Sequence, residues 1–332
     1  MNLAKFPRRR YTEGQTPIEK LSRLTEMLGG PSIYVKRDDL LGLTAGGNKT
    51  RKLEFVAAEA LAQGADTLIT CGAVQSNHCR ITASAAVKEG MKCRLVLEER
   101  VAHSYKEKGS GNNLLFHLLG VEKITVVPGD SDMGAAMQQE ADEVAAGGGK
   151  AYIVPGGASF PVGALGYVSC AEEIQNQMFE MGLNFDHIIC PSGSAGTHAG
   201  LVVGFWGNNW EAAISGINVR REKAVQEKNV HKLAVETAEY IGLEGEVPRD
   251  LVVCYDEYVG PGYSLPTAGM VEAVKLLCRT EGILLDPVYS GKAMAGLLDL
   301  VKKGHFGKED NVLFLHTGGS PAIYTYVDSF LG

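Results

Sequence analysis

The feature that most constrains the fold is the regular alternation of short apolar segments with longer segments of helical character. The apolar segments are rich in Val, Ile and Leu, and glycine often bounds them; they lie at 33–37, 67–72, 93–97, 124–127, 152–154, 188–190, 214–217, 252–254 and 312–315. Segments with apolar residues at helical spacing separate them, among them 53–61, 76–88, 112–119, 133–146 and 164–181. Buried strands that alternate with helices are typical of parallel sheets covered by helices on both faces.

This alternation predicts an α/β protein with two open, mostly parallel, twisted sheets. Residues 50–162 contain a β–α series of their own, which indicates a small inserted α/β domain. Residues 1–49 and 163–332 would then form the large, cofactor-binding domain. The length of 332 residues suits two such units.

Composition narrows the classes of function. The chain is 45% hydrophobic with a net charge of −7, and it has no basic patch interleaved with aromatic residues, so nucleic acid is not expected as a partner. No apolar run is long enough to span a membrane, and no signal peptide is recognisable. Seven scattered cysteines without a C-x-x-C pair predict reduced thiols in a cytoplasmic protein without a metal site. The charged stretch 221–232 is interpreted as the solvated face of a helix.

The segment Gly46-Gly47-Asn48-Lys49 places a lysine directly before a helical segment. Glycines allow backbone to approach a ligand closely. At the mouth of a helix and near Lys52, the Lys49 amine is expected to have a lowered pKa, which makes it a candidate nucleophile toward a carbonyl. An ordinary surface lysine at a helix start is the alternative for this segment taken alone.

A second glycine-containing loop follows the apolar segment 188–190. Its residues Ser194, Ala195, Gly196 and Thr197 open an apolar helix, and free N–H groups with hydroxyls at such a place form a cradle for an anion. The loop lacks the Gly-Lys-Ser/Thr ending of a nucleotide P-loop and a clean G-x-G-x-x-G. A phosphate monoester therefore fits better than a nucleotide, and a plain βα turn is the alternative.

Three further places present polar side chains at strand ends or in loops. Ser76 is positioned to cap the helix that follows it, and His78 has no evident partners for a catalytic triad. Tyr263 and Tyr289 lie in loops rich in glycine and proline, where a tyrosine can hold or move a proton. Thr317 follows the last apolar segment, where a hydroxyl can meet a flat heterocycle.

Together these features indicate pyridoxal 5′-phosphate as the cofactor. Lys49 would form a Schiff base with its aldehyde, and the loop from Ser194 to Thr197 would hold its phosphate. A neutral hydroxyl at the pyridine nitrogen, from Thr317 or Ser290, would leave that nitrogen unprotonated. Such a cofactor is a weaker electron sink, which suits elimination better than transamination.

The chain resembles the fold-type II pyridoxal-phosphate enzymes of the D-cysteine desulfhydrase and 1-aminocyclopropane-1-carboxylate (ACC) deaminase group. Six motifs in order carry the resemblance: Lys36-Arg37-Asp38-Asp39, Gly46-Gly47-Asn48-Lys49, Gln75-Ser76-Asn77-His78, Gly193-Ser194-Ala195-Gly196-Thr197, Asp286-Pro287-Val288-Tyr289 and His316-Thr317-Gly318-Gly319. The resemblance implies a fold like that of the tryptophan synthase β subunit and a homodimer. It also implies that Lys52 contacts the cofactor's phosphate and that Asn48 is a further cofactor contact. Asn77 would bond the cofactor's ring oxygen, and Ser76 would lie beside the substrate.

Within this group, Ser290 stands where the ACC deaminases have a glutamate. Residues 3–8, 42–55 and 286–292 are similar to the L-cysteate sulfo-lyases. The expected reaction is therefore β-elimination of L-cysteate to pyruvate, ammonium and sulfite. D-cysteine desulfhydrase is the alternative, followed by ACC deaminase, by a cofactor-binding protein without turnover, and by a phosphosugar- or nucleotide-binding module.

The resemblance and the position of each side chain give a set of residues expected around a small amino-acid substrate. Lys49 would remove the Cα proton, and with a D-substrate Ser76 or a tyrosine would share the role of base. The candidates for substrate contacts are Gln75, Ser76, Asn77, His78, Ser159, Tyr263, Tyr289 and Thr317.

Overall fold

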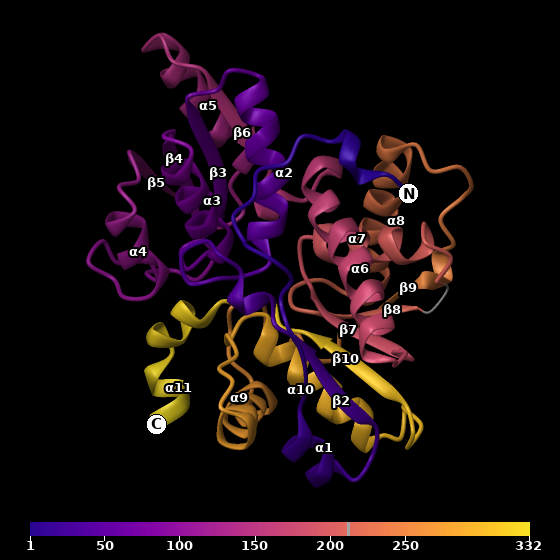
Figure 1. The fold of residues 1–332 in the computed structure, drawn as a ribbon. Coiled ribbons are helices and arrows are strands. Elements are labelled where there is room, and N and C mark those ends of the chain that lie inside the picture. Colours follow the sequence, from indigo (N-terminus) through magenta and orange to yellow (C-terminus); the bar gives the residue numbers. More distant parts are fainter. Residues whose placement is uncertain (211–212) are drawn as a thin grey trace.

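The computed structural model describes residues 1–210 and 213–332, which form two sheets with helices on both faces of each (Figure 1). The larger sheet has the strand order β1-β2-β10-β7-β8-β9, and only the β1–β2 pair is antiparallel. Its strands are β1 (Ile18–Lys20), β2 (Ser32–Lys36), β7 (His187–Ser192), β8 (Ile214–Asn218), β9 (Val252–Tyr255) and β10 (Asn311–Leu315). This arrangement confirms the α/β architecture expected from the sequence.

The smaller sheet is wholly parallel, with the order β5-β4-β3-β6. Its strands are β3 (Thr67–Ala73), β4 (Lys92–Glu99), β5 (Lys123–Pro128) and β6 (Ala151–Val154). All of them fall within residues 50–162, the range that the sequence assigns to an inserted domain; the boundaries of that domain stay a prediction.

Helices connect most of the strands. The α-helices are α1 (Ser22–Leu28), α2 (Lys49–Ala62), α3 (Asn77–Lys88), α4 (Asn112–Leu118), α5 (Met133–Ala146), α6 (Pro161–Met181), α7 (Gly196–Trp206), α8 (Lys223–Ile241), α9 (Ala268–Glu281), α10 (Ser290–Lys302) and α11 (Val327–Leu331). Short 3₁₀ helices are η1 (Leu3–Lys5), η2 (Asp38–Leu40), η3 (Gly156–Ala158), η4 (Arg249–Leu251) and η5 (Ser320–Thr325). No helix of the described residues is long and apolar enough to cross a membrane.

The central strands of the larger sheet, β7, β8 and β10, are buried on both faces. In β10, Val312 and Phe314 belong to a core shared with α9 and α10, whereas Leu313 and Leu315 belong to a core shared with α6 and α7. Successive side chains of a strand point to opposite faces, so one apolar strand fills two cores. The smaller sheet follows the same rule, with α5 packed on one face and α2 and α3 on the other.

A buried ionic network fixes the beginning of α2. Arg51 Nε lies 2.8 Å from a carboxylate oxygen of Asp38, and Arg51 Nη1 lies 2.8 Å from a carboxylate oxygen of Glu173. The Tyr167 hydroxyl donates to Asp38 at 2.6 Å. Burial favours the neutral form of Asp38, but Arg51 outweighs it and lowers the pKa of this carboxyl to about 2. The charged motif that begins at Lys36 therefore holds the first turn of α2 in place.

The loop before α2 passes through a narrow space that only glycine can occupy. Gly46 has φ +64° and Gly47 has φ +120°, and a Cβ on Gly46 would lie 1.7 Å from the carbonyl oxygen of Asp39. A Cβ on Gly47 would lie 3.2 Å from the carbonyl oxygen of Thr317. The close packing of this loop sets α2 to start at Lys49, which confirms the predicted position of that lysine.

Candidate active site

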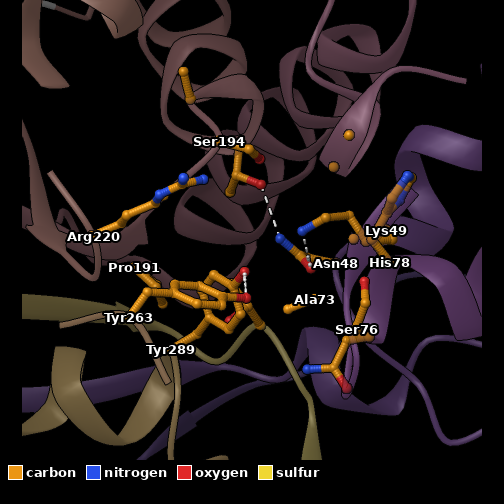
Figure 2. A pocket seen from close by; sticks show the side chains of 18 of the residues that line it. Asn48, Lys49, Ala73, Ser76, His78, Pro191, Ser194, Arg220, Tyr263 and Tyr289 are labelled. Carbon is orange, nitrogen blue, oxygen red and sulfur yellow. Dashed lines mark hydrogen bonds between the residues drawn. The ribbon is translucent and has the colours of Figure 1, made fainter. Parts of the chain in front are cut away.

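A cavity of about 230 Å³ lies between the two sheets, at the carboxyl ends of their parallel strands (Figure 2). Its walls come from the ends of β3, β4 and β6 in the smaller sheet and of β7, β8 and β10 in the larger one. The first turns of α2, α3 and α7 also contribute residues. Open parallel sheets bind ligands at this edge, and free N–H groups at helix starts favour an anion there.

Lys49 projects into this cavity from the first turn of α2 (Figure 2). Its Nζ donates to Asn48 Oδ1 at 3.1 Å and lies 5.9 Å from the centre of the Tyr289 ring. Burial lowers the pKa of Lys49 to about 8, Asp286 opposes this shift and Arg80 adds to it. The lowering expected from the sequence is confirmed, but burial and Arg80 cause it, and not the nearby Lys52 that the sequence suggested.

Lys52 lies one turn further along α2, beside the start of α7. Its Nζ is buried and donates to the carbonyl oxygen of Gly157 at 3.1 Å. Burial first, and then the charge of Lys49, hold the pKa of Lys52 well below its usual value. Among the described residues, no carboxylate forms an ion pair with the Lys52 ammonium. The first residue of α7, Gly196, lies so close to this ammonium that a Cβ on it would be only 2.8 Å from Lys52 Nζ.

The glycine loop after β7 forms the wall next to Lys52. Ala195 adopts φ +78° directly before α7, and Thr197 Oγ1 accepts a hydrogen bond from Asn48 Nδ2 at 2.9 Å. Ser159 Oγ donates to Ser194 Oγ at 2.8 Å and accepts from the N–H of Gly196 at 3.2 Å. Ser159, which the sequence assigns to the substrate, therefore contacts the glycine loop.

The start of α3 lines the opposite side of the cavity. Ser76 Oγ accepts from the N–H of Cys79 at 3.1 Å, which confirms Ser76 as the cap of this helix. His78 Nε2 lies 2.7 Å from Thr70 Oγ1. Burial, reinforced by Lys49, holds the pKa of His78 well below its usual value, so the imidazole is neutral.

The two amides that flank Ser76 are engaged with α4. Asn77 Oδ1 accepts from Asn112 Nδ2 at 2.9 Å, and Asn77 also lines the cavity. Gln75 Oε1 accepts from the N–H of Asn112 at 2.8 Å, while its Nε2 donates to the carbonyl oxygen of Ser110 at 3.1 Å. Gln75 thus lines a neighbouring cavity and is not among the residues that line the cavity around Lys49.

The two predicted tyrosines meet each other at the floor of the cavity (Figure 2). The hydroxyl oxygens of Tyr263 and Tyr289 are 2.6 Å apart. Burial raises the pKa of both phenols, and for Tyr289 the neighbouring Tyr263 adds to the rise. Both groups are therefore protonated, and the pair can donate one proton into the cavity while one hydroxyl supports the other.

The two hydroxyls expected near a heterocycle have different surroundings. Thr317 lines the cavity at the end of β10. Ser290 Oγ is buried, donates to Asp286 Oδ1 at 2.7 Å and accepts from the N–H of Asp286 at 2.8 Å. Asp286 Oδ2 also accepts from the N–H of Tyr289 at 3.0 Å, so this turn fixes the start of α10 and the position of the tyrosine.

The cavity is also lined by three arginines that the sequence did not indicate: Arg100, Arg220 and Arg221. Arg100 follows β4, and the other two follow β8, so the rule that ligands bind at the carboxyl ends of parallel strands was the signal available. The expectation of a solvated helix face was wrong for Arg221. Helix α8 begins only at Lys223, and Arg221 Nη1 donates to the carbonyl oxygen of Gly193 at 2.6 Å.

Comparison with known proteins identifies the family. Residues 9–318 match the family model described as "Pyridoxal-phosphate dependent enzyme". The chain belongs to this family. It therefore uses pyridoxal phosphate as its cofactor, as the sequence predicts.

Two relatives match nearly the whole chain. A D-cysteine desulfhydrase of Yersinia enterocolitica is 45% identical over 325 residues, which is 98% of this chain and 97% of the relative. A 1-aminocyclopropane-1-carboxylate deaminase of Methylobacterium sp. (strain 4-46) is 44% identical over 333 residues, which is 99% of each chain. The protein is thus a pyridoxal-phosphate-dependent lyase of the D-cysteine desulfhydrase and ACC deaminase group.

Solved structures agree with this assignment. The crystal structure of an ACC deaminase homologue is similar with a TM-score of 0.87 and 38% identity, covering 99% of this chain and 97% of that one. O-ureido-L-serine synthase is similar with a TM-score of 0.69 and 19% identity, covering 97% of this chain and 94% of that one, and it supports the fold alone. Together these matches confirm the fold-type II architecture.

Proposed function

We propose that this lyase acts on L-cysteate and releases pyruvate, ammonium and sulfite by β-elimination. The observation that carries the proposal is the charge of the cavity. Lys49, Arg100, Arg220 and Arg221 line it, and no aspartate or glutamate is among the described residues that do so. L-Cysteate brings a carboxylate and a sulfonate, whereas cysteine and ACC each bring one carboxylate, so cysteate complements this charge best.

The residues around Lys52 fit the phosphate of the cofactor. An ammonium buried with one carbonyl partner is costly unless an anion joins it. The start of α7 lies beside it, where free N–H groups attract negative charge. We propose that Lys52, Ser194, Ala195, Gly196 and Thr197 bind the phosphate, and that Ser159 supports the loop.

The remaining contacts of the cofactor follow from the side chains that face the same cavity. Lys49 would hold its aldehyde carbon, with Asn48 orienting the amine from 3.1 Å. Asn77 would bond the ring oxygen from the start of α3. Thr317 is favoured over Ser290 as the partner of the pyridine nitrogen, because the hydroxyl of Ser290 is already bonded twice to Asp286.

The bound cofactor supplies a sink for the negative charge that develops at the substrate Cα. Lys49, with a pKa of about 8, is suited to accept the Cα proton near neutral pH. The first turn of α3, with Ser76 and the neutral His78, is a place for the substrate carboxylate because it offers free N–H groups. The pair Tyr263 and Tyr289 can donate a proton to the leaving group.

D-Cysteine desulfhydrase is the second candidate, and the tyrosine pair is the observation that favours it. A leaving thiolate, with a pKa of about 8.5, benefits from a proton donor more than the weakly basic sulfite does. The hydroxyls of Tyr263 and Tyr289 are protonated and 2.6 Å apart, as such a donor requires. The name of the Yersinia enterocolitica relative agrees with this alternative.

Product analysis separates these candidates. The purified holoenzyme is given L-cysteate, D-cysteine, L-cysteine or ACC, and sulfite, sulfide, pyruvate and 2-oxobutyrate are measured. We expect sulfite and pyruvate from L-cysteate to dominate. Sulfide from D-cysteine with negligible sulfite would reverse the order of the candidates, and dominant 2-oxobutyrate would indicate an ACC deaminase. No product from any substrate would favour a cofactor-binding protein without turnover.

The homodimer and the cytoplasmic location stay predictions from sequence.

A further inference from the structure

The three arginines of the cavity form one positively charged cluster at the ends of β4 and β8. Arg221 reports their proximity: burial lowers its pKa, and the charges of Arg220 and Arg100 lower it further. Like charges that share a site repel one another, so the cluster is more favourable with an anion bound. Glu98 is the carboxylate that pairs with Arg100.

Two of these arginines already have partners. Arg100 Nε pairs with Glu98, and its guanidinium carbon lies 4.5 Å from the centre of the Tyr263 ring. Arg221 Nη1 donates to the carbonyl oxygen of Gly193 at 2.6 Å, which ties it to the glycine loop. These contacts account for the positions of both side chains without a ligand.

Arg220 differs from both. It is exposed, and among the described residues its side chain makes no ion pair and no hydrogen bond. Exposed arginines without a partner are common on protein surfaces. This one, however, lines the cavity and enters it from the side opposite Lys49, near Ser194 and the tyrosine pair (Figure 2).

We propose that Arg220 binds the sulfonate of the substrate and is the residue that distinguishes L-cysteate from amino acids with uncharged side chains. The inference rests on the proposed function. A guanidinium presents two parallel N–H groups that match two oxygens of a tetrahedral anion. The substrate carboxylate is placed at the start of α3 and the phosphate beside Lys52, so Arg220 is left as the cation for the sulfonate. Arg100 adds its positive charge to the same cluster while it stays paired with Glu98.

The cofactor phosphate is the other anion that Arg220 can reach, since Ser194 is nearby (Figure 2). The phosphate already has Lys52 and the first turn of α7. A role of Arg220 toward the phosphate would weaken cofactor binding for every substrate. A role toward the sulfonate would weaken only the binding of cysteate, so the two are separable.

The test compares Arg220→Gln and Arg220→Lys with Arg249→Gln, which removes the same charge from an exposed arginine in η4. Three quantities are measured: cofactor affinity by absorbance titration of the apoenzyme, ligand affinity of the holoenzyme from its absorbance change, and sulfite release. The ligands are L-cysteate and L-serine, which share the α-amino carboxylate and differ in the sulfonate.

For Arg220→Gln we expect a loss of roughly 10- to 100-fold in L-cysteate affinity and in kcat/KM, the size expected when a hydrogen bond to a charged group is lost. L-Serine affinity and cofactor affinity should change less than about 3-fold. Arg220→Lys should fall between, because an ammonium keeps the charge without the fork. Arg249→Gln should match the wild type.

Two results would overturn the inference: unchanged L-cysteate affinity in Arg220→Gln, or equal losses for both ligands together with weaker cofactor binding. Failure of the proposed function looks different, because the wild type would then release no sulfite from L-cysteate. Ligand affinity tests Arg220 in that case as well. If the wild type does not bind L-cysteate more tightly than L-serine, the inference fails too.

Discussion

Thr197 provides the sharpest test of the proposed phosphate site. Its buried hydroxyl accepts from Asn48 Nδ2 at 2.9 Å, and Asn48 Oδ1 in turn accepts from Lys49 Nζ at 3.1 Å. The Thr197 hydroxyl therefore has its own hydrogen to donate to a phosphate oxygen. Loss of a hydrogen bond to a charged group costs about 1.5–3 kcal/mol, so Thr197→Ala should weaken cofactor binding roughly 10- to 150-fold.

The assay is a titration of the apoenzyme with pyridoxal phosphate, followed by kcat at saturating cofactor. We expect the dissociation constant to rise while kcat falls much less, and Thr197→Ser to restore most of the affinity. Thr237→Ala is the matched control, because its buried hydroxyl donates to the carbonyl oxygen of Leu233 at 2.6 Å within α8. Cofactor affinity equal to wild type in Thr197→Ala would refute the reasoning and make the loop an ordinary turn between β7 and α7.

Two other predictions concern groups of the cavity that bind or donate a proton. Burial lowers the pKa of Lys49 to about 8 from 10.5, so the folded apoprotein binds this proton less tightly than the unfolded chain does. Lys49→Met should therefore stabilise the apoprotein below about pH 8, and the gain should shrink toward pH 10.5. Urea unfolding across this pH range measures the gain in stability, with Lys302→Met at an exposed lysine as the control. A gain that does not change with pH would contradict the lowered pKa of Lys49. Tyr289→Phe removes one hydroxyl of the tyrosine pair and should slow sulfide release from D-cysteine roughly 10²-fold, but sulfite release from L-cysteate less than ~10-fold. Equal losses in kcat for the two substrates would argue against a proton donor.

The fold and the position of the central lysine could be predicted because local sequence determines them. Apolar segments bounded by glycine are the parallel strands of the structure. The residues from Gly46 to Lys52 are consecutive in the chain, so the start of α2 at Lys49 could be predicted from these residues alone. Ser76 as a helix cap is equally local, since its partner Cys79 is three residues away.

Contacts between distant segments could not be predicted in this way. Arg100 and Arg220 lie 120 positions apart and follow strands of different sheets, so only the packing of the two sheets brings them to one cavity. Gln75 neighbours Ser76 in sequence, but its amide bonds to Asn112 and points to a different cavity. The charged run 221–232 gave no indication that α8 begins after Arg221, which leaves this side chain in a loop at the cavity.

Reductive trapping tests the central claim, that Lys49 is the lysine at which the cofactor acts. Burial lowers the pKa of three lysines, Lys49, Lys52 and Lys292, and that of Lys49 and of Lys292 falls to about 8. A lowered pKa alone therefore does not distinguish them. Only Lys49 among the three is a lining residue of the cavity in the part of the chain that the structure describes. After borohydride reduction of the holoenzyme and peptide mapping, we expect the cofactor on Lys49 alone. A label on Lys52 or Lys292, or on no lysine, would contradict the account.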